Sequence, residues 1–398
     1  MPVCLARNDP SVGCAPLNET LLPAPGMSAK NTGVLLERRL APLFGKAYCK
    51  LTANATTGIC LALKAAGIQG RTVGVPNGVC VNVPLAVLYS GNTPVYLDID
   101  PKTLGLSPKI LSNSQTPLAA VVAVHAYGYP CDIDGILGWC RQHRVFLIED
   151  VAAAQGAGVS KVPAGAFGDV AVVSFGAGKI IDAGGGGAVF ADDPALLGEI
   201  SRLERTLPDS DSLTARNLDE FSRYHTKLYN DHYGKDLDGC AAEFRARAIA
   251  LRDCFIRRAR PDAFAERLVA GLDTLEENLE QRARNATRLA ARFTGSPAPG
   301  VVPFAAPSGS AIWRFNLQVE HGRHKLLRHL LGKGYKISSW FPSVDQFFEK
   351  RGESGIRTPN SDHIGDTILN IWVNYEIDES YLSRIGDDIC AFANVPLR

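Results

Sequence analysis

The sequence carries almost no net charge, because 42 Lys and Arg residues stand against 41 Asp and Glu residues over 398 positions. A broad surface for nucleic acid or for an anionic membrane needs a clear excess of positive charge. The composition therefore gives no reason to expect either partner, and it favours a small-molecule ligand.

Long apolar runs are also missing. No stretch reaches the roughly 18 apolar residues that a membrane span requires, and the N-terminal residues do not join a charged start to a long apolar segment. We therefore expect a cytoplasmic protein that does not insert into a membrane.

The ten cysteines form no metal-binding pattern, because none belongs to a CxxC pair or to another metal-ligand spacing. They are scattered over positions Cys4, Cys14, Cys49, Cys60, Cys80, Cys131, Cys140, Cys240, Cys254 and Cys390. We predict reduced thiols and no metal site.

From Gly33 onward, apolar segments of strand length alternate with segments of helical periodicity. The expected helices are 34–44, 56–66, 81–90 and 132–143, and the expected strands are 72–75, 94–97, 119–124, 145–148, 170–174 and 188–191. This alternation predicts an α/β fold, in which helices flank a mainly parallel sheet and ligands bind beyond the carboxyl ends of the strands.

The length suits two domains rather than one. We expect an N-terminal arm at 1–30, and a large α/β domain at 31–260 that carries a helical insertion at about 204–254. Residues 261–398 would hold a long connecting helix at 264–293 and a small α+β domain. The small domain would contain strands 311–319 and 367–373 and helices 325–333 and 379–393.

Two residues at strand ends indicate a particular chemistry. Lys179 follows the apolar strand 169–175 and precedes four glycines at 184–187, while Asp150 ends the apolar strand 145–150. A lysine in an apolar pocket can lose its proton near neutral pH and condense with an aldehyde, and a nearby carboxylate can hold a pyridinium nitrogen. The pair indicates pyridoxal phosphate chemistry. Taken alone, a surface lysine and a helix-capping aspartate are the plainer interpretations.

At these residues the chain resembles the DegT/DnrJ/EryC1/StrS family, the sugar-aminotransferase branch of the fold type I pyridoxal phosphate enzymes. The resemblance runs from about Gly33 to the C-terminus. It is carried by segments 91–101 (GNTPVYLDIDP), 124–134 (VHAYGYPCDID), 148–150 (IED), 168–169 (GD), 174–179 (SFGAGK) and 184–193 (GGGGAVFADD).

The resemblance implies roles for several residues. Lys179 would hold pyridoxal 5'-phosphate covalently and then carry a proton, and Asp150 would pair with the pyridine nitrogen. The cofactor phosphate would bind Ser174 and the turn Ala55, Thr56 and Thr57 at a helix start, where amide groups and the helix dipole attract anions. The turn could equally be a simple helix cap, and Ser174 could merely end a strand.

The chain departs from the family pattern at several positions. Cys80 stands where the family usually places an aromatic ring over the cofactor, and Ala153 stands where it usually has Gln or His. We still expect both residues to line the cofactor.

The family also has a loop whose asparagine crosses from the second subunit to the cofactor phosphate. The corresponding loop at 255–260 of this chain has no asparagine. Arg257 or Arg258 could replace it, because a guanidinium fork suits phosphate oxygens; the alternative is a basic surface loop.

His125 and Tyr127 follow a predicted strand and are candidates for substrate binding. A single histidine at such a place is also a common hydrogen-bonded structural group.

Together these features predict an aminotransferase that moves an amino group from a donor such as glutamate or glutamine to a keto sugar or similar polyhydroxylated ketone in a biosynthetic pathway. The family analogy also implies a homodimer with a shared active site. Two alternatives stay open: a lyase, replacement or decarboxylation reaction with the same cofactor, and a regulatory homologue without catalysis.

Overall fold

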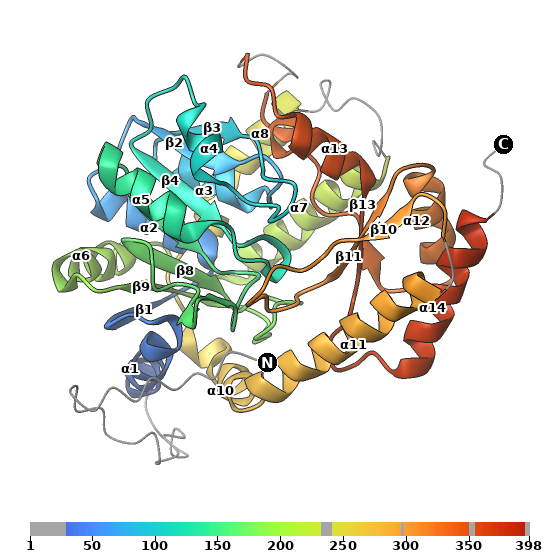
Figure 1. The fold of residues 1–398 in the computed structure, drawn as a ribbon. Coiled ribbons are helices and arrows are strands. Elements are labelled where there is room, and N and C mark those ends of the chain that lie inside the picture. Colours follow the sequence, from blue (N-terminus) through green and yellow to red (C-terminus); the bar gives the residue numbers. More distant parts are fainter. Residues whose placement is uncertain (1–28, 232–240, 296–297, 350–354, 395–398) are drawn as a thin grey trace.

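The computed structural model describes residues 29–231, 241–295, 298–349 and 355–394 (Figure 1). Nearly all of the predicted N-terminal arm therefore lies outside the described residues. No helix within these ranges is both long enough and apolar enough to cross a membrane.

A seven-stranded sheet in the order β1-β9-β8-β5-β4-β2-β3 forms the centre of the large part of the chain. Its strands are β1 (Tyr48–Thr52), β2 (Thr72–Pro76), β3 (Thr93–Leu97), β4 (Ala120–Val124), β5 (Phe146–Asp150), β8 (Val170–Ser174) and β9 (Gly187–Ala191). The neighbours from β3 to β8 pair in parallel, whereas β9 is antiparallel to both β8 and β1. The predicted mainly parallel sheet is confirmed. The short edge strand β1 was not predicted. The strands β6 (Gly158–Val159) and β7 (Val162–Pro163) form a separate two-stranded sheet.

Helices cover both faces of this sheet, which explains the continuous apolar runs of its strands. Successive residues of β4 belong to different cores: Val122 lies in the same core as Ile59 and Leu63, and Val121 lies in the same core as Ile136. The helices of this part are α1 (Ala29–Leu40), α2 (Ala55–Ala65), α3 (Asn82–Tyr89), α4 (Pro108–Ser112), α5 (Ile133–His143) and α6 (Pro194–Glu204).

Three further helices, α7 (Ser212–Asp231), α8 (Ala241–Ala250) and α9 (Arg252–Phe255), follow the sheet within the range of the predicted helical insertion. Their aromatic side chains join the core on the α2 and α3 side, where Phe244 and Phe255 are buried against Phe221. These helices therefore add to the core on one face of the large sheet.

The expected single helix at 264–293 is wrong, because two helices occupy this stretch: α10 (Ala265–Asp273) and α11 (Leu275–Gly295). The break lies at Thr274, whose backbone leaves the helical region and whose hydroxyl donates to the Ala270 carbonyl at 3.0 Å. Such local bonding competes with helix continuation. In Figure 1, α11 runs from the large sheet toward the small one, beside α14 (Glu379–Ala393).

The C-terminal part contains an antiparallel sheet in the order β10-β11-β13-β12. Its elements are β10 (Val301–Pro303), β11 (Phe315–Val319), α12 (Arg323–Gly332), β12 (Ile337–Ser338), α13 (Pro359–Thr367), β13 (Ile368–Ile371) and α14. This confirms a small α+β unit, while the domain boundary near residue 260 stays a prediction.

The expected strand at 311–319 begins only at Phe315, because residues 311–313 bond to the turn after β4 instead. The Ala311 amide donates to the Gly128 carbonyl at 3.0 Å, and the Trp313 amide donates to the Tyr127 carbonyl at 3.1 Å. Gly128 has φ +90, and a Cβ there would lie 1.6 Å from the Ala311 carbonyl oxygen, so the contact requires glycine. This junction places Trp313 beside the large sheet.

Candidate active site

Lys179 and Asp150 come from neighbouring strands of the large sheet. Asp150 is the last residue of β5, and Lys179 lies in the connection from β8 to β9. Each group affects the pKa of the other. The charge of Lys179 acts to lower the pKa of Asp150, and the charge of Asp150 acts to raise the pKa of Lys179. The fold therefore brings the two groups together at the carboxyl edge of the sheet.

Burial dominates the titration of both groups. It raises the pKa of Asp150 and lowers the pKa of Lys179, because an apolar surrounding disfavours either charged form. One oxygen of Asp150, Oδ1, accepts the Ala152 amide at 2.8 Å, while Oδ2 accepts no hydrogen bond from the described residues. A buried carboxylate with an unused oxygen is suited to receive a cationic N–H group.

The loop that carries Lys179 is held from both sides. The Lys179 amide donates to the Gly176 carbonyl at 3.2 Å, and Asp182 accepts the Gly178 amide at 2.7 Å. The Gly178 carbonyl accepts the indole N–H of Trp313 at 2.6 Å. The Lys179 amine lies 4.9 Å from the centre of the Trp313 ring. The C-terminal unit thus fixes the backbone next to the lysine.

The start of α2 offers an anion site. The three residues predicted to bind the phosphate there differ in whether their hydrogen-bond donors are already used within the protein. Asn54 caps the helix by accepting the Thr57 amide at 2.8 Å, and the Thr57 hydroxyl donates to the Phe255 carbonyl at 2.9 Å. Thr57 is therefore engaged within the protein. The amides of Ala55 and Thr56 and the Thr56 hydroxyl have no hydrogen-bond partner in the described part of the chain, so they are free to bind a phosphate.

Ser174, the last residue of β8, lies beside this helix start. It pairs with Gly187 of β9, and a Cβ at Gly187 would lie 2.9 Å from the Ala55 amide nitrogen. A side chain at Gly187 would therefore push the helix start away from the sheet. The Ser174 Oγ accepts the Gly176 amide at 3.3 Å, and its own proton remains available for donation.

Cys80 and Ala153 contribute small side chains to the same region. Cys80 lies close enough to Lys179 and Asp150 for their charges to affect its thiol, and burial raises the pKa of that thiol. Ala153 is buried in the turn that follows Asp150. The aromatic ring that contacts Lys179 is instead Trp313, which sequence reasoning missed because it lies 134 positions further along the chain, in a segment without a distinctive motif.

His125 is fully buried, and both of its ring nitrogens bond within the protein. Its Nε2 lies 2.9 Å from Oε1 of Glu149, and its Nδ1 accepts the Cys131 amide at 3.1 Å. No ring nitrogen is left for a substrate, so this geometry fits the structural alternative. Tyr127 is also buried, with its hydroxyl donating to the Trp340 carbonyl and accepting the Phe341 amide, both at 2.7 Å.

The predicted arginines lie on the segment that follows α9. Arg258 donates from Nε to Asp209 Oδ1 at 2.9 Å, and Arg257 donates to the Cys254 carbonyl. The same segment reaches the start of α2, because the Phe255 carbonyl accepts the Asn54 side-chain amide at 3.0 Å. The segment therefore borders the anion site of its own chain, with Arg258 already paired to a carboxylate.

Replacing Glu149 with alanine is expected to destabilise the fold by about 3 kcal/mol, because it removes the buried acceptor of several donors. The carboxylate bonds His125 at 2.9 Å and accepts the amides of Gly165 at 2.6 Å, Phe167 at 2.9 Å and Gly168 at 3.0 Å. Urea unfolding measures the loss. The exposed Glu277→Ala serves as control, and equal stability of the two variants would contradict the assignment.

The same carboxylate should make stability depend on acidity. Burial works to raise the pKa of Glu149, but hydrogen bonds from His125 and from backbone amides outweigh it and hold the pKa below its usual value. A lowered pKa contributes stability above the unfolded value of about 4.3, and this is lost as pH falls through the folded value. The difference in free energy of unfolding between wild type and Glu149→Ala should therefore become smaller below about pH 4.

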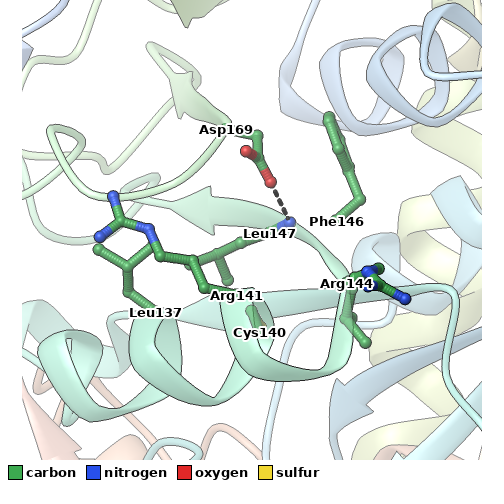
Figure 2. A pocket seen from close by; sticks show the side chains of 8 residues that line it. Leu137, Cys140, Arg141, Arg144, Phe146, Leu147 and Asp169 are labelled. Atoms are coloured by element: carbon green, nitrogen blue, oxygen red, sulfur yellow. Dashed lines mark hydrogen bonds between the residues drawn. The ribbon is translucent and has the colours of Figure 1, made fainter.

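Figure 2 shows a pocket of about 320 Å³ at the other end of β5. Its lining includes Arg141 and Arg144 from α5 and the end of that helix, together with Asp169, which accepts the Leu147 amide at 2.7 Å. Because Leu147 lies near the start of β5 and Asp150 at its end, this pocket is separate from the Lys179 site.

The family model that matches this chain, over residues 27–216, is described as the DegT/DnrJ/EryC1/StrS aminotransferase family. GDP-perosamine synthase of Caulobacter vibrioides is 38% identical over 172 residues, covering 43% of this chain and 46% of that protein. UDP-N-acetyl-3-dehydro-alpha-D-glucosamine 3-aminotransferase of Acidithiobacillus ferrooxidans is 33% identical over 253 residues, covering 61% and 63%. The chain thus spans less than two thirds of the length of either relative.

A solved structure extends the likeness over most of the chain. DesI in the presence of its TDP-sugar product has a TM-score of 0.74 and 25% sequence identity, and the match covers 91% of this chain and 85% of that one. This similarity confirms the fold class expected from the sequence.

Proposed function

We propose that the chain, whose residues 27–216 match the model of the DegT/DnrJ/EryC1/StrS aminotransferase family, is a member of that family and a pyridoxal-phosphate-dependent aminotransferase. It would move an amino group from an amino acid donor to a keto sugar or similar polyhydroxylated ketone. The observation that carries this proposal is the convergence of Lys179 and Asp150 at one edge of the sheet, each in the other's electrostatic field.

The residues at this edge fit the proposed cofactor. Bound pyridoxal phosphate supplies a ring that accepts electrons from the carbon next to the amino nitrogen. The unused Oδ2 of Asp150 would accept the ring N–H. The free amides of Ala55 and Thr56, with the hydroxyls of Thr56 and Ser174, would hold the phosphate. Thr57 would act by fixing the helix start rather than by direct contact.

Lys179 would hold the cofactor and then move the proton. Burial lowers the pKa of its amine and so favours the neutral form, in which Nζ would take the proton from the α-carbon of the donor. The bond between the Trp313 indole and the Gly178 carbonyl keeps the adjacent backbone in place during this transfer.

The acceptor class is proposed from the relatives. The names of GDP-perosamine synthase and of the UDP-linked 3-aminotransferase refer to nucleotide-linked sugars, and DesI was solved in the presence of its TDP-sugar product. A biosynthetic pathway for a sugar or a secondary metabolite fits these names. We further propose a homodimer with a shared active site. We also propose a cytoplasmic location, because the free cysteines of the described residues suit a reducing compartment.

A visible spectrum of the purified protein with its cofactor tests the function. We expect an absorption band of the lysine-bound cofactor that bleaches on addition of glutamate or glutamine and returns on addition of a keto acceptor. Product released from an amino acid alone, with no keto acceptor present, would instead support the lyase-type alternative. A band that no amino acid bleaches would favour a regulatory homologue.

A further inference from the structure

Three tryptophans from separate segments gather where the small sheet meets the lysine loop. Trp313 precedes β11, Trp340 follows β12 and Trp372 follows β13. The Trp340 ring stacks on Trp313 with the ring centres 6.2 Å apart, and its centre lies 6.3 Å from that of Trp372. Trp313 is 3% exposed and Trp340 is 37% exposed. The cluster therefore runs from the interior beside Lys179 to the surface of the described chain.

Buried arginines hold the inner part of this cluster in place. The Arg314 guanidinium carbon lies 3.8 Å from the centre of the Trp372 ring and 4.3 Å from that of Trp313. Its Nη2 donates to the Gly178 carbonyl at 3.3 Å, and Nη1 of Arg282 donates to the Trp313 carbonyl at 3.0 Å. Cation–π contacts and these hydrogen bonds fix two of the three indoles against the lysine loop.

The backbone of Trp340 is fixed on both sides by buried side chains. Its amide donates to Oδ1 of Asn370 at 2.8 Å, and its carbonyl accepts the Tyr127 hydroxyl at 2.7 Å. Asn370 and Tyr127 are each 1% exposed. An indole that is open to solvent on an immobilised backbone loses little conformational entropy when a ligand covers it. Such a ring is suited to act as a rigid binding platform.

The place of Trp340 in the site limits what it can bind. It is one ring removed from Trp313, whose centre lies 4.9 Å from the Lys179 amine. A group stacked on Trp340 therefore lies next to the carbon that receives the amino group. In a nucleotide-linked ketone, a ribose and a diphosphate separate the base from the keto ring. The keto ring, rather than the base, is thus the part that reaches this indole while the ketone reacts.

On the basis of the proposed aminotransferase function, we propose that Trp340 is the platform on which the ring of a cyclic keto acceptor stacks. One face of a polyhydroxylated ring presents C–H groups, which pack on an indole by dispersion and by attraction to the negative face of its π system. The hydroxyl groups at the edge of the ring keep their contact with water. An open-chain keto acid has no such face, so the platform distinguishes the acceptor from the keto acid of the donor.

The experiment starts from enzyme whose absorption band has been bleached with glutamine, and it measures the rate at which a ketone restores the band. The cyclic probe is scyllo-inosose and the open-chain probe is 2-oxoglutarate. We expect Trp340→Ala to lower kcat/KM for scyllo-inosose relative to 2-oxoglutarate roughly tenfold, mainly by raising KM. Trp340→Phe keeps a smaller ring, so its ratio should fall between those of wild type and Trp340→Ala. The rate of bleaching by glutamine should match wild type in both variants.

The matched control is Tyr48→Ala, which also removes an exposed aromatic ring. Tyr48 is 45% exposed and pairs with Ala191, which pairs with Val170 at the start of β8. It therefore lies at the end of the sheet opposite to the lysine loop, and its removal should leave both probes unaffected.

An unchanged ratio in Trp340→Ala would overturn the platform, and so would an equal loss with both probes, which indicates a structural role. Thymidine diphosphate is added as an inhibitor of the scyllo-inosose reaction. Weaker inhibition in Trp340→Ala with an unchanged ratio would assign the indole to a nucleobase instead. If Trp340→Ala does not fold, Trp340→Phe decides by the same ratio.

Two results with wild type separate this proposal from the proposed function. A band that 2-oxoglutarate restores and scyllo-inosose does not would contradict the cyclic acceptor while leaving aminotransfer intact. A band that no amino acid bleaches contradicts the proposed function itself.

Discussion

Replacing Lys179 with alanine is expected to abolish the covalent cofactor adduct and to reduce amino transfer by at least about 10⁴-fold. The amine has two tasks, to bond the cofactor and to move the proton at the α-carbon, and no other lysine amine in the described chain is placed near Asp150. Borohydride reduction followed by mass spectrometry measures the adduct, and the absorption band reports the same bond.

The exposed Lys102→Ala provides the control, because it removes an amine from the surface and leaves the site intact. It should keep both the adduct and the wild-type rate. If borohydride still traps a cofactor adduct in Lys179→Ala, another nitrogen holds the cofactor. The assignment of the site would then be wrong.

Replacing Asp150 with asparagine is expected to lower the turnover number by about 10²- to 10³-fold while the covalent adduct persists. The amide has nearly the same shape, but it cannot stabilise a cationic ring nitrogen as a carboxylate does. Burial already raises the pKa of Asp150, so loss of its charge should not unfold the protein. Single-turnover bleaching rates with glutamate separate this effect from cofactor binding.

The exposed Asp134→Asn on α5 is the matched substitution and should behave as wild type. An Asp150→Asn enzyme within a few-fold of the wild-type rate would mean that the ring nitrogen does not need this carboxylate. Thermal unfolding of both variants checks that any loss of rate is chemical rather than structural.

Much of the large sheet could be predicted because its strands are buried on both faces. Such strands read as unbroken apolar runs, as in 120–124 and 170–174, and the periodic segments between them read as helices. The candidates Lys179 and Asp150 followed from their places at strand ends, since parallel strands deliver their carboxyl ends to one edge. The family resemblance rests on the same short contiguous segments.

Features that depend on distant contacts were missed or wrong. The edge strand β1 pairs with β9, about 140 residues later, and its short polar sequence gives little sign of a strand. The late start of β11 likewise depends on the bonds from residues 311–313 to the Tyr127 turn. The break at Thr274, in contrast, is accompanied by local bonding that helical periodicity does not reveal. The engagement of His125 by Glu149 and of Thr57 by Phe255 likewise becomes visible only when the chain is folded.

By itself the sequence determined the alternation of strands and helices, the sheet edge at which the chemistry is expected, and the lysine and aspartate proposed to carry it. These are properties of neighbouring residues and of their hydrophobic periodicity. Only the tertiary structure decided that Trp313 and Arg314 adjoin the lysine loop and that Arg282 and Arg314 are buried with no ion pair to an acidic side chain of the described residues. The physical reason is that burial and charge pairing are set by segments far apart in the chain, and no local pattern records which of them will meet.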